Sequence, residues 1–181
     1  MPLVFQQQIS EDSVIASAFQ IANAARTAPK AKGVDNLVIA VLYGGDLEAF
    51  ADKMVELSKD SPAAPIVVRD AGNLRNSQAL ILIGTKIKSH GLNCGLCGFG
   101  TCAHRVEHHP DAPCFFNSHD LGIAVGSAAS RAADMRIDNR VMYSIGSIAA
   151  RLSLLGEDVP IITAIPLTIA SKSPYFDRKQ G

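Results

Sequence analysis

Apolar residues recur along the chain with two different periods. Residues 37–44, LVIAVLYG, form an unbroken apolar and β-branched run, which is typical of a strand buried on both sides. Between residues 12 and 26, apolar positions follow instead the i, i+4, i+7 spacing of one helix face. These positions are Val14, Ala18, Ile21, Ala22 and Ala25. The N-terminal part of the chain therefore predicts a helix, a loop at 27–36 and a buried strand.

The same two patterns predict the remaining elements. Helices are expected at 46–60, 120–137 and 140–156, and strands at 64–72, 78–86 and 159–169. The predicted helix caps are Ser10, Asp46, Asp138 and Gly156. Because no repeat or interdomain linker interrupts this order, we expect a single domain over residues 1–181. Its class is α/β (α+β), with a three-layer-like arrangement.

Composition and charge narrow the classes of partner. Lys and Arg together number 17, as do Asp and Glu, and hydrophobic residues make up 48% of the 181 residues. Without a basic surplus, neither a nucleic acid nor an anionic membrane surface is expected as a partner. The N-terminus lacks a signal-peptide pattern, and no apolar run approaches the ~18 residues of a membrane span. We therefore expect a cytoplasmic protein, in a compartment where disulfides are rare.

All four cysteines lie in one glycine-rich stretch, within a predicted insertion at 90–119. Cys94, Cys97, Cys102 and Cys114 have the spacing C-x2-C-x4-C-x11-C. Two intervening residues let both sulfurs of a C-x2-C pair point toward one metal site. Four thiolates at compact spacing therefore indicate a metal centre.

The spacing favours an iron–sulfur cluster over zinc. A structural zinc usually takes two paired knuckles, C-x2-C and then C-x2-C or H-x3-H, and no second C-x2-C follows here. Uneven spacing suits the corners of a [4Fe–4S] cube, and the flanking glycines let backbone N–H groups approach the sulfides. A structural zinc or cluster site in a non-catalytic protein is the alternative.

Every histidine of the chain lies in or beside this stretch: His90, His104, His108, His109 and His119. One interpretation makes an imidazole a zinc ligand or a neighbour of the cluster. The other makes HRVEHHP a solvated helix end that Pro110 stops. Because four thiolates are available, an imidazole ligand is not required, which favours the second interpretation.

The motif GLNCGLCGFGTC, followed by PC, DLGIAVGSAASRA, DNRVMYSIG and YFDR, resembles a family of prokaryotic proteins described as containing a ferredoxin domain. The resemblance extends from about residue 10 to residue 178. Its first three cysteines are also similar to the C-x2-C-x4-C motif of iron–sulfur domains in electron-transport-complex and corrinoid-protein subunits. The resemblance implies a cluster on Cys94, Cys97, Cys102 and Cys114, and a redox partner, but no particular reaction.

Three further stretches are similar to flavin-dependent nitroreductases: IANAARTAPKAKGVDNLVIAVL, GSAASRAADMRI and IITAIPLTI. This likeness implies a nitroreductase-like fold, a homodimer, and flavin mononucleotide (FMN) at the subunit interface of an oxidoreductase. The arginine-rich stretch that grips the flavin phosphate in that family has no counterpart in FQQQISEDSV. The phosphate would need Arg26, Lys30 and Lys32, which are otherwise a solvated basic loop. FMN is therefore possible, but we expect little or none to be bound.

Overall fold

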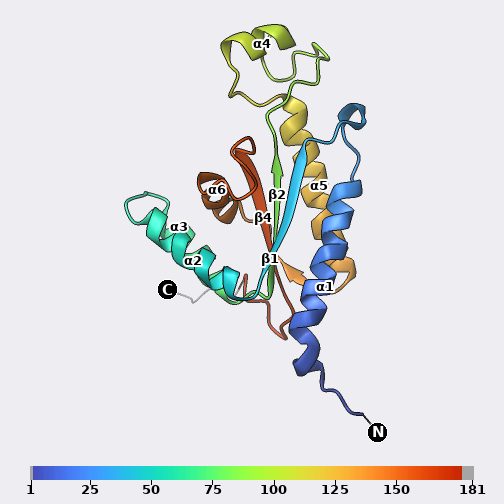
Figure 1. Ribbon diagram of the computed structural model, residues 1–181, viewed down its shortest axis with the longest axis vertical. Coiled ribbons are helices and arrows are strands. Elements are labelled where there is room, and N and C mark those ends of the chain that lie inside the picture. The colour runs from blue at the N-terminus through green and yellow to red at the C-terminus, as the bar shows by residue number, and fades with distance from the viewer. Residues whose placement is uncertain (1, 177–181) are drawn as a thin grey trace.

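The computed structural model describes residues 2–176, with only the backbone of Gln8, and within them the chain forms a four-stranded antiparallel sheet (Figure 1). The strand order is β1-β2-β4-β3. The strands are β1 Leu37–Tyr43, β2 Ala79–Thr85, β3 Asp138–Asn139 and β4 Ile161–Thr168. Both long neighbours of β2 run antiparallel to it. Because β2 lies between them, it is buried along its whole length.

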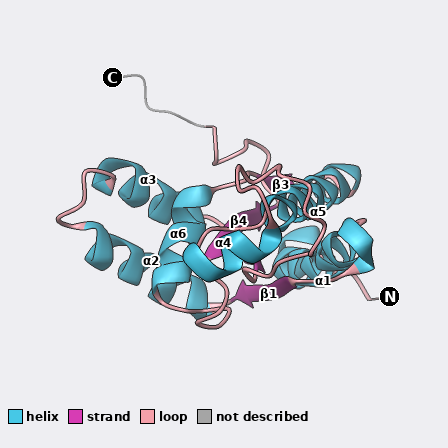
Figure 2. Ribbon diagram, turned by 90° about the horizontal axis from the view of Figure 1, so that it is seen from above, coloured by secondary structure: helices cyan, strands magenta, loops and turns pink. Residues whose placement is uncertain are grey.

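Helices cover both faces of the sheet, so the predicted three-layer arrangement is confirmed (Figures 1 and 2). α1 Gln6–Thr27 and α5 Phe115–Asp134 lie on one face. α2 Gly45–Ser58, α3 Ala64–Arg75 and α6 Tyr143–Arg151 lie on the other. Alternate β2 side chains serve the two cores: Ile81 and Ile83 pack with α1 and α5, whereas Leu80 and Leu82 pack with the other helices.

Two helices depend on close packing. In α1, the predicted positions Val14, Ala18, Ile21 and Ala25 are fully buried. In α6, a Cβ atom added to Gly146 would lie 2.0 Å from the carbonyl oxygen of Ile162. α6 therefore lies directly against β4, at a distance that only glycine permits.

The prediction of a strand at 64–72 is wrong, because these residues begin α3. Pro65 lies in the first turn of the helix, where its missing N–H costs nothing. Val67, Ala71 and Leu74 follow the i, i+4, i+7 spacing and are buried against the second core. The β-branched run that indicated a strand also includes Ile66 and Val68, which point outward.

The predicted helix caps at the N-terminal ends are also wrong. α1 begins at Gln6, so Ser10 lies inside it. Gly44, with φ +66°, precedes α2. Asp46 lies in the first turn of α2, where its negative charge interacts favourably with the positive end of the helix dipole. Asp138 belongs to β3, and Met142 is the N-cap residue of α6.

At its other end, α6 is shorter than predicted. It ends at Arg151 with Leu152 as C-cap, and Gly156, with φ +112°, belongs to the turn that follows. Among residues 2–176, no helix is both long and apolar enough to cross a membrane.

Candidate metal centre in the cysteine segment

The four cysteines lie beyond one end of the sheet, in the connection between β2 and α5 (Figure 1). We call residues 86–114 the cysteine segment. Its first part, up to residue 101, has no helix or strand, and α4 Cys102–His108 follows. Viewed from above in Figure 2, α4 lies over the end of the sheet. The last five residues of the predicted insertion, 115–119, belong to α5 instead.

A tight turn carries Cys94 and Cys97. Gly95 and Gly98 have φ of +72° and +83°, and the Gly98 N–H donates to the Gly95 carbonyl at 2.9 Å. Only glycine adopts such angles without strain, so this backbone path depends on both residues. Cys94 is exposed and Cys97 is half-buried.

Cys102 is held by a reciprocal contact with Asn93. Its Sγ accepts the Asn93 N–H at 3.3 Å, and its own N–H donates to Asn93 Oδ1 at 2.8 Å. The Asn93 N–H is the main cause that lowers the pKa of the Cys102 thiol, followed by the Ser89 hydroxyl. Donors around the sulfur favour the thiolate, which is the form that binds metal.

Cys114 is buried at the N-terminus of α5, where it is the N-cap residue. Its N–H donates to Asn117 Oδ1 at 3.1 Å, and its side chain accepts from the Asn117 N–H. This capping box starts α5 five residues earlier than the predicted 120, and the C-x-x-N pattern was the sequence signal for it.

A cavity of about 440 Å³ lies between the two halves of the segment. Its lining includes Cys97, Cys114, Phe99, Phe115 and His119. The structure thus brings two of the four cysteines to one cavity. Among the described residues, no three cysteine, histidine or carboxylate side chains converge on a single ion. Cys94 and Cys102 do not line this cavity, so ligation by all four cysteines requires a rearrangement of the cysteine segment.

Three buried side chains near the cysteines have nitrogen atoms without a hydrogen-bond partner among the described residues. These atoms are Nδ1 and Nε2 of His90, Nε of Arg105 and Nδ2 of Asn117. Elsewhere in residues 2–176, Ser173 Oγ alone shares this condition. Buried donors are rarely left unpaired, because each lost bond costs free energy. The sequence does not indicate Arg105 or Asn117 as site residues, because nothing in it predicts their burial.

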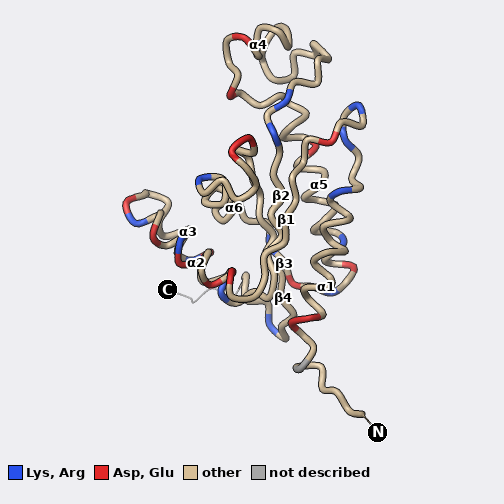
Figure 3. The backbone as a smooth tube through the Cα atoms, viewed as in Figure 1, with Lys and Arg blue, Asp and Glu red and all other residues tan. Residues whose placement is uncertain are grey.

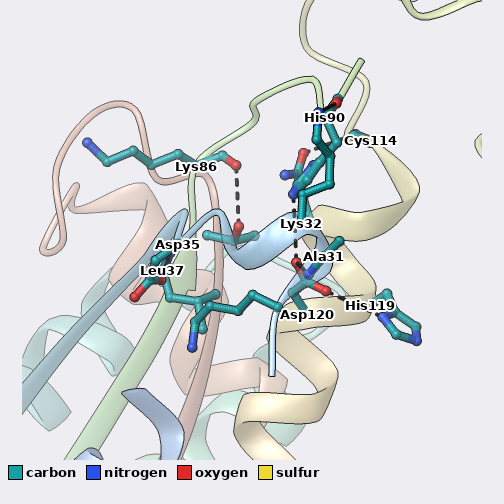
Figure 4. A network of polar contacts seen from close by, with 12 residues as sticks. Ala31, Lys32, Asp35, Leu37, Lys86, His90, Cys114, His119 and Asp120 are labelled. Carbon is teal, nitrogen blue, oxygen red and sulfur yellow. Dashed lines mark hydrogen bonds and ion pairs between the residues drawn. The ribbon is translucent and has the colours of Figure 1, made fainter. Parts of the chain in front are cut away.

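A polar network joins the cysteine segment to the body of the protein (Figure 4). The His90 carbonyl accepts from Lys32 Nζ at 3.0 Å. His90 Nε2 lies 3.8 Å from Asp120 Oδ2, beyond hydrogen-bond distance, and the same oxygen accepts the Ala31 N–H at 3.1 Å. The loop after α1, the cysteine segment and α5 are therefore held together at one point.

The three cations predicted for a flavin phosphate all contact acceptors of the chain itself. Arg26 donates to Asp35 at 2.7 Å and to the Leu37 carbonyl at 2.9 Å. Lys30 Nζ donates to the carbonyls of Arg26 and Ala28, and Lys32 to that of His90. The structure therefore does not direct these three side chains toward a common anion.

The histidines divide into two groups. His104, His108 and His109 are exposed at α4, where His104 and His108 have ring centroids 4.6 Å apart. Their exposure agrees with the interpretation of HRVEHHP as a solvated helix end. His119 stacks on Phe115 at 5.4 Å beside the cavity, and His90 is buried against Phe116 at 5.7 Å.

Residues 110–178 match the family described as "Uncharacterized protein containing a ferredoxin domain (DUF2148)". This match includes Cys114 but not the first three cysteines. A protein of Archaeoglobus fulgidus, itself described as uncharacterized, is 38% identical over 183 residues, which cover 97% of each chain. The likeness to this relative thus extends over nearly the whole sequence.

Solved structures of nitroreductases share the fold. Nitroreductase CinD from Lactococcus lactis, in complex with nicotinic acid, is 17% identical with a TM-score of 0.60, covering 90% of this chain and 80% of its own. The FMN-dependent nitroreductase NfnB from Mycobacterium smegmatis, in complex with NADPH, is 9% identical with a TM-score of 0.60, covering 89% and 81%. The predicted nitroreductase-like fold is confirmed.

Proposed function

The chain belongs to the family of proteins described as containing a ferredoxin domain, and from this premise we propose that it is an iron–sulfur redox protein. We propose Cys94, Cys97, Cys102 and Cys114 as the ligands of one [4Fe–4S] cluster. The observation that carries the proposal is the group of buried, unpartnered nitrogen donors on His90, Arg105 and Asn117. Anionic sulfur atoms are the acceptors that such donors lack.

The residues of the segment fit this group in three further respects. Hydrogen-bond donors around Cys102 favour its thiolate, and Cys114 lies at the N-terminus of α5. Phe99 and Phe115 line the cavity that Cys97 and Cys114 share, so they keep water from its wall. A cluster held there would take up and release one electron at a time. Electron transfer, or an oxidoreductase reaction with a separate redox partner, is the function that we propose.

Flavin is the cofactor that the fold by itself suggests, because NfnB is named as FMN-dependent. The side chains of this chain support a different conclusion. Arg26 is engaged by Asp35, and Lys30 and Lys32 by backbone carbonyls. A phosphate would have to compete for each of them. We therefore expect FMN to bind weakly, if at all, to the purified protein.

The proposal also includes a compartment and an oligomeric state. Four free thiols suit a reducing cytoplasm. Gly122 and Gly126 are exposed on the outer face of α5, with open space where a Cβ would be, so a second copy could approach closely there. We propose a homodimer, for which light scattering should give about twice the 19.1 kDa of one chain. A mass near that of one chain at micromolar concentration would contradict it.

Single substitutions test the proposed ligands. Cys94→Ala, Cys97→Ala and Cys102→Ala should each abolish the brown colour and the iron and sulfide content of the anaerobically reconstituted protein, because each removes one of four thiolates. Cys114→Ala should do the same, although His119 lies beside the same cavity as a possible substitute ligand. His108→Ala, on the exposed side of α4, is the control and should load fully. Full iron and sulfide in any of the first three variants would refute the assignment.

A further inference from the structure

We propose that Arg105 is the buried counter-ion of the metal centre and that its positive charge raises the reduction potential of that centre. This inference rests on the proposed function. It assigns a role to a side chain that carries no ligand atom and that the cysteine motif does not include.

The surroundings of Arg105 are unusual for a guanidinium group. Only 3% of the residue is exposed. Its Nη1 donates to the Ala112 carbonyl, and its Nε has no acceptor among the described residues. Nor does any described carboxylate form an ion pair with it, whereas Arg26 and Arg69 each have one and Arg75 has two. A buried cation without an anion is strongly unfavourable, so a fold that contains one is expected to supply the anion in another form.

The position of Arg105 identifies that anion. Arg105 lies three residues after Cys102 on α4, so both side chains project from the same side of the helix. The carbonyl that it contacts belongs to Ala112, two residues before Cys114. Arg105 thus joins the two stretches that carry the third and fourth cysteines. Four thiolates outweigh the positive charge of a cubane core, so the loaded site is an anion.

The direction of the effect on the potential follows from charge. One electron from an external donor makes the loaded site more negative by one unit, and no bond or proton is lost in this step. A fixed positive charge close by stabilises the more negative, reduced form more than the oxidised form. Low exposure strengthens this interaction, because little water screens it. Removal of the charge should therefore lower the potential.

A redox titration of loaded protein tests the inference. At the midpoint potential of the wild type, Arg105→Gln should show a ratio of reduced to oxidised centre at least about tenfold lower, equivalent to about 59 mV for one electron. Arg105→Lys keeps the charge and should remain within about threefold of the wild type. Arg136→Gln, exposed beyond the far end of α5, is the control and should not differ from it. Loaded Arg105→Gln with the midpoint of the wild type would overturn the inference.

A melting experiment decides the matter even if Arg105→Gln does not load. Arg105→Met removes the charge and keeps much of the apolar volume. In metal-free protein it should raise the melting temperature by about 2–4 °C, because it removes an uncompensated buried cation. After metal loading, Arg105→Met should melt at a lower temperature than the loaded wild type, whether the variant takes up the full amount of metal or less. An equal decrease with and without metal would show a purely structural side chain and overturn the inference. Absence of iron and sulfide from the wild type would instead refute the proposed function itself.

Discussion

Buried polar groups at the two ends of the molecule differ in how completely the chain itself satisfies them. In the body of the protein, Asp70 is only 2% exposed, yet it contacts Ser144 Oγ, Arg69 Nε and Asn73 Nδ2. Tyr175 is also buried there, and its hydroxyl lies 2.9 Å from Ser77 Oγ. In and beside the cysteine segment, His90, Arg105 and Asn117 keep nitrogen atoms without partners.

The number of charged side chains also differs between the body of the protein and the end around α4. Acidic and basic side chains are spread over the helices of the body, whereas the end of the molecule around α4 carries few of them (Figure 3). Between residues 91 and 114, the charged side chains other than histidine are Arg105, Glu107 and Asp111. Away from the cysteine segment and the start of α5, Ser173 Oγ is the one described buried side-chain atom without a hydrogen-bond partner. The cysteine segment, in contrast, has donors and thiols that a bound group would complete.

The largest expected effect is in the body of the protein. Gly146→Ala should destabilise the metal-free protein by about 3 kcal/mol or more, because the added Cβ would lie 2.0 Å from the Ile162 carbonyl oxygen and α6 would have to move. Urea denaturation measures this loss. Gly72→Ala, in the open part of α3, is the matched control and should stabilise by about 0.5–1 kcal/mol. Equal stability of Gly146→Ala and the wild type would contradict the packing of α6 on β4.

A second substitution tests whether the body is independent of the metal. Asp70→Ala leaves Ser144 and Arg69 without their buried acceptor and should cost about 2–3 kcal/mol. Because Asp70 is remote from the cysteine segment, this loss should be the same in metal-free and loaded protein. Asp52→Ala removes only an exposed partner of Arg75 and should cost less than about 1 kcal/mol. A loss at Asp70 that depended on metal would show that the two ends are coupled.

The smallest effect concerns the pH dependence of one thiol. The pKa of Cys102 is lowered, chiefly by the N–H of Asn93, from an ordinary value of 9.0. In metal-free protein the reactive thiolate should therefore persist at lower pH than in the same thiol of the urea-unfolded chain. Alkylation rates at Cys102, followed by mass spectrometry from pH 6 to 10, measure this difference. Identical pH profiles for folded and unfolded protein would mean that the Asn93 contact does not form in solution.

The sequence was informative wherever one pattern dominated. β2 is apolar at nearly every position because it is covered on both faces, and the pattern predicted it within a residue or two. The sequence predicts a strand where α3 lies, because its short β-branched run satisfies both periods. Only the contact of Val67, Ala71 and Leu74 with the second core decides between them. That contact is tertiary, whereas the helical spacing of these three residues is present in the sequence beside the β-branched run.

Some features of the candidate site could likewise be predicted from the sequence, whereas others depend on tertiary contacts. Cysteine spacing alone indicated which thiols could act together. The burial of Arg105 could not be predicted, since it depends on how residues 109–112 fold back across α4. Likewise, an exposed arginine and a buried one look alike in a sequence. The internal contacts of Arg26, Lys30 and Lys32 became visible only when the structure placed Asp35 and His90 beside them.

Iron, acid-labile sulfide and zinc, determined together in one anaerobically reconstituted sample of the full chain, test the central claim most directly. We predict about four iron and four sulfide per chain, and a brown colour that dithionite bleaches. One zinc per chain without sulfide, or a chain that takes up neither iron nor sulfide, would contradict the account.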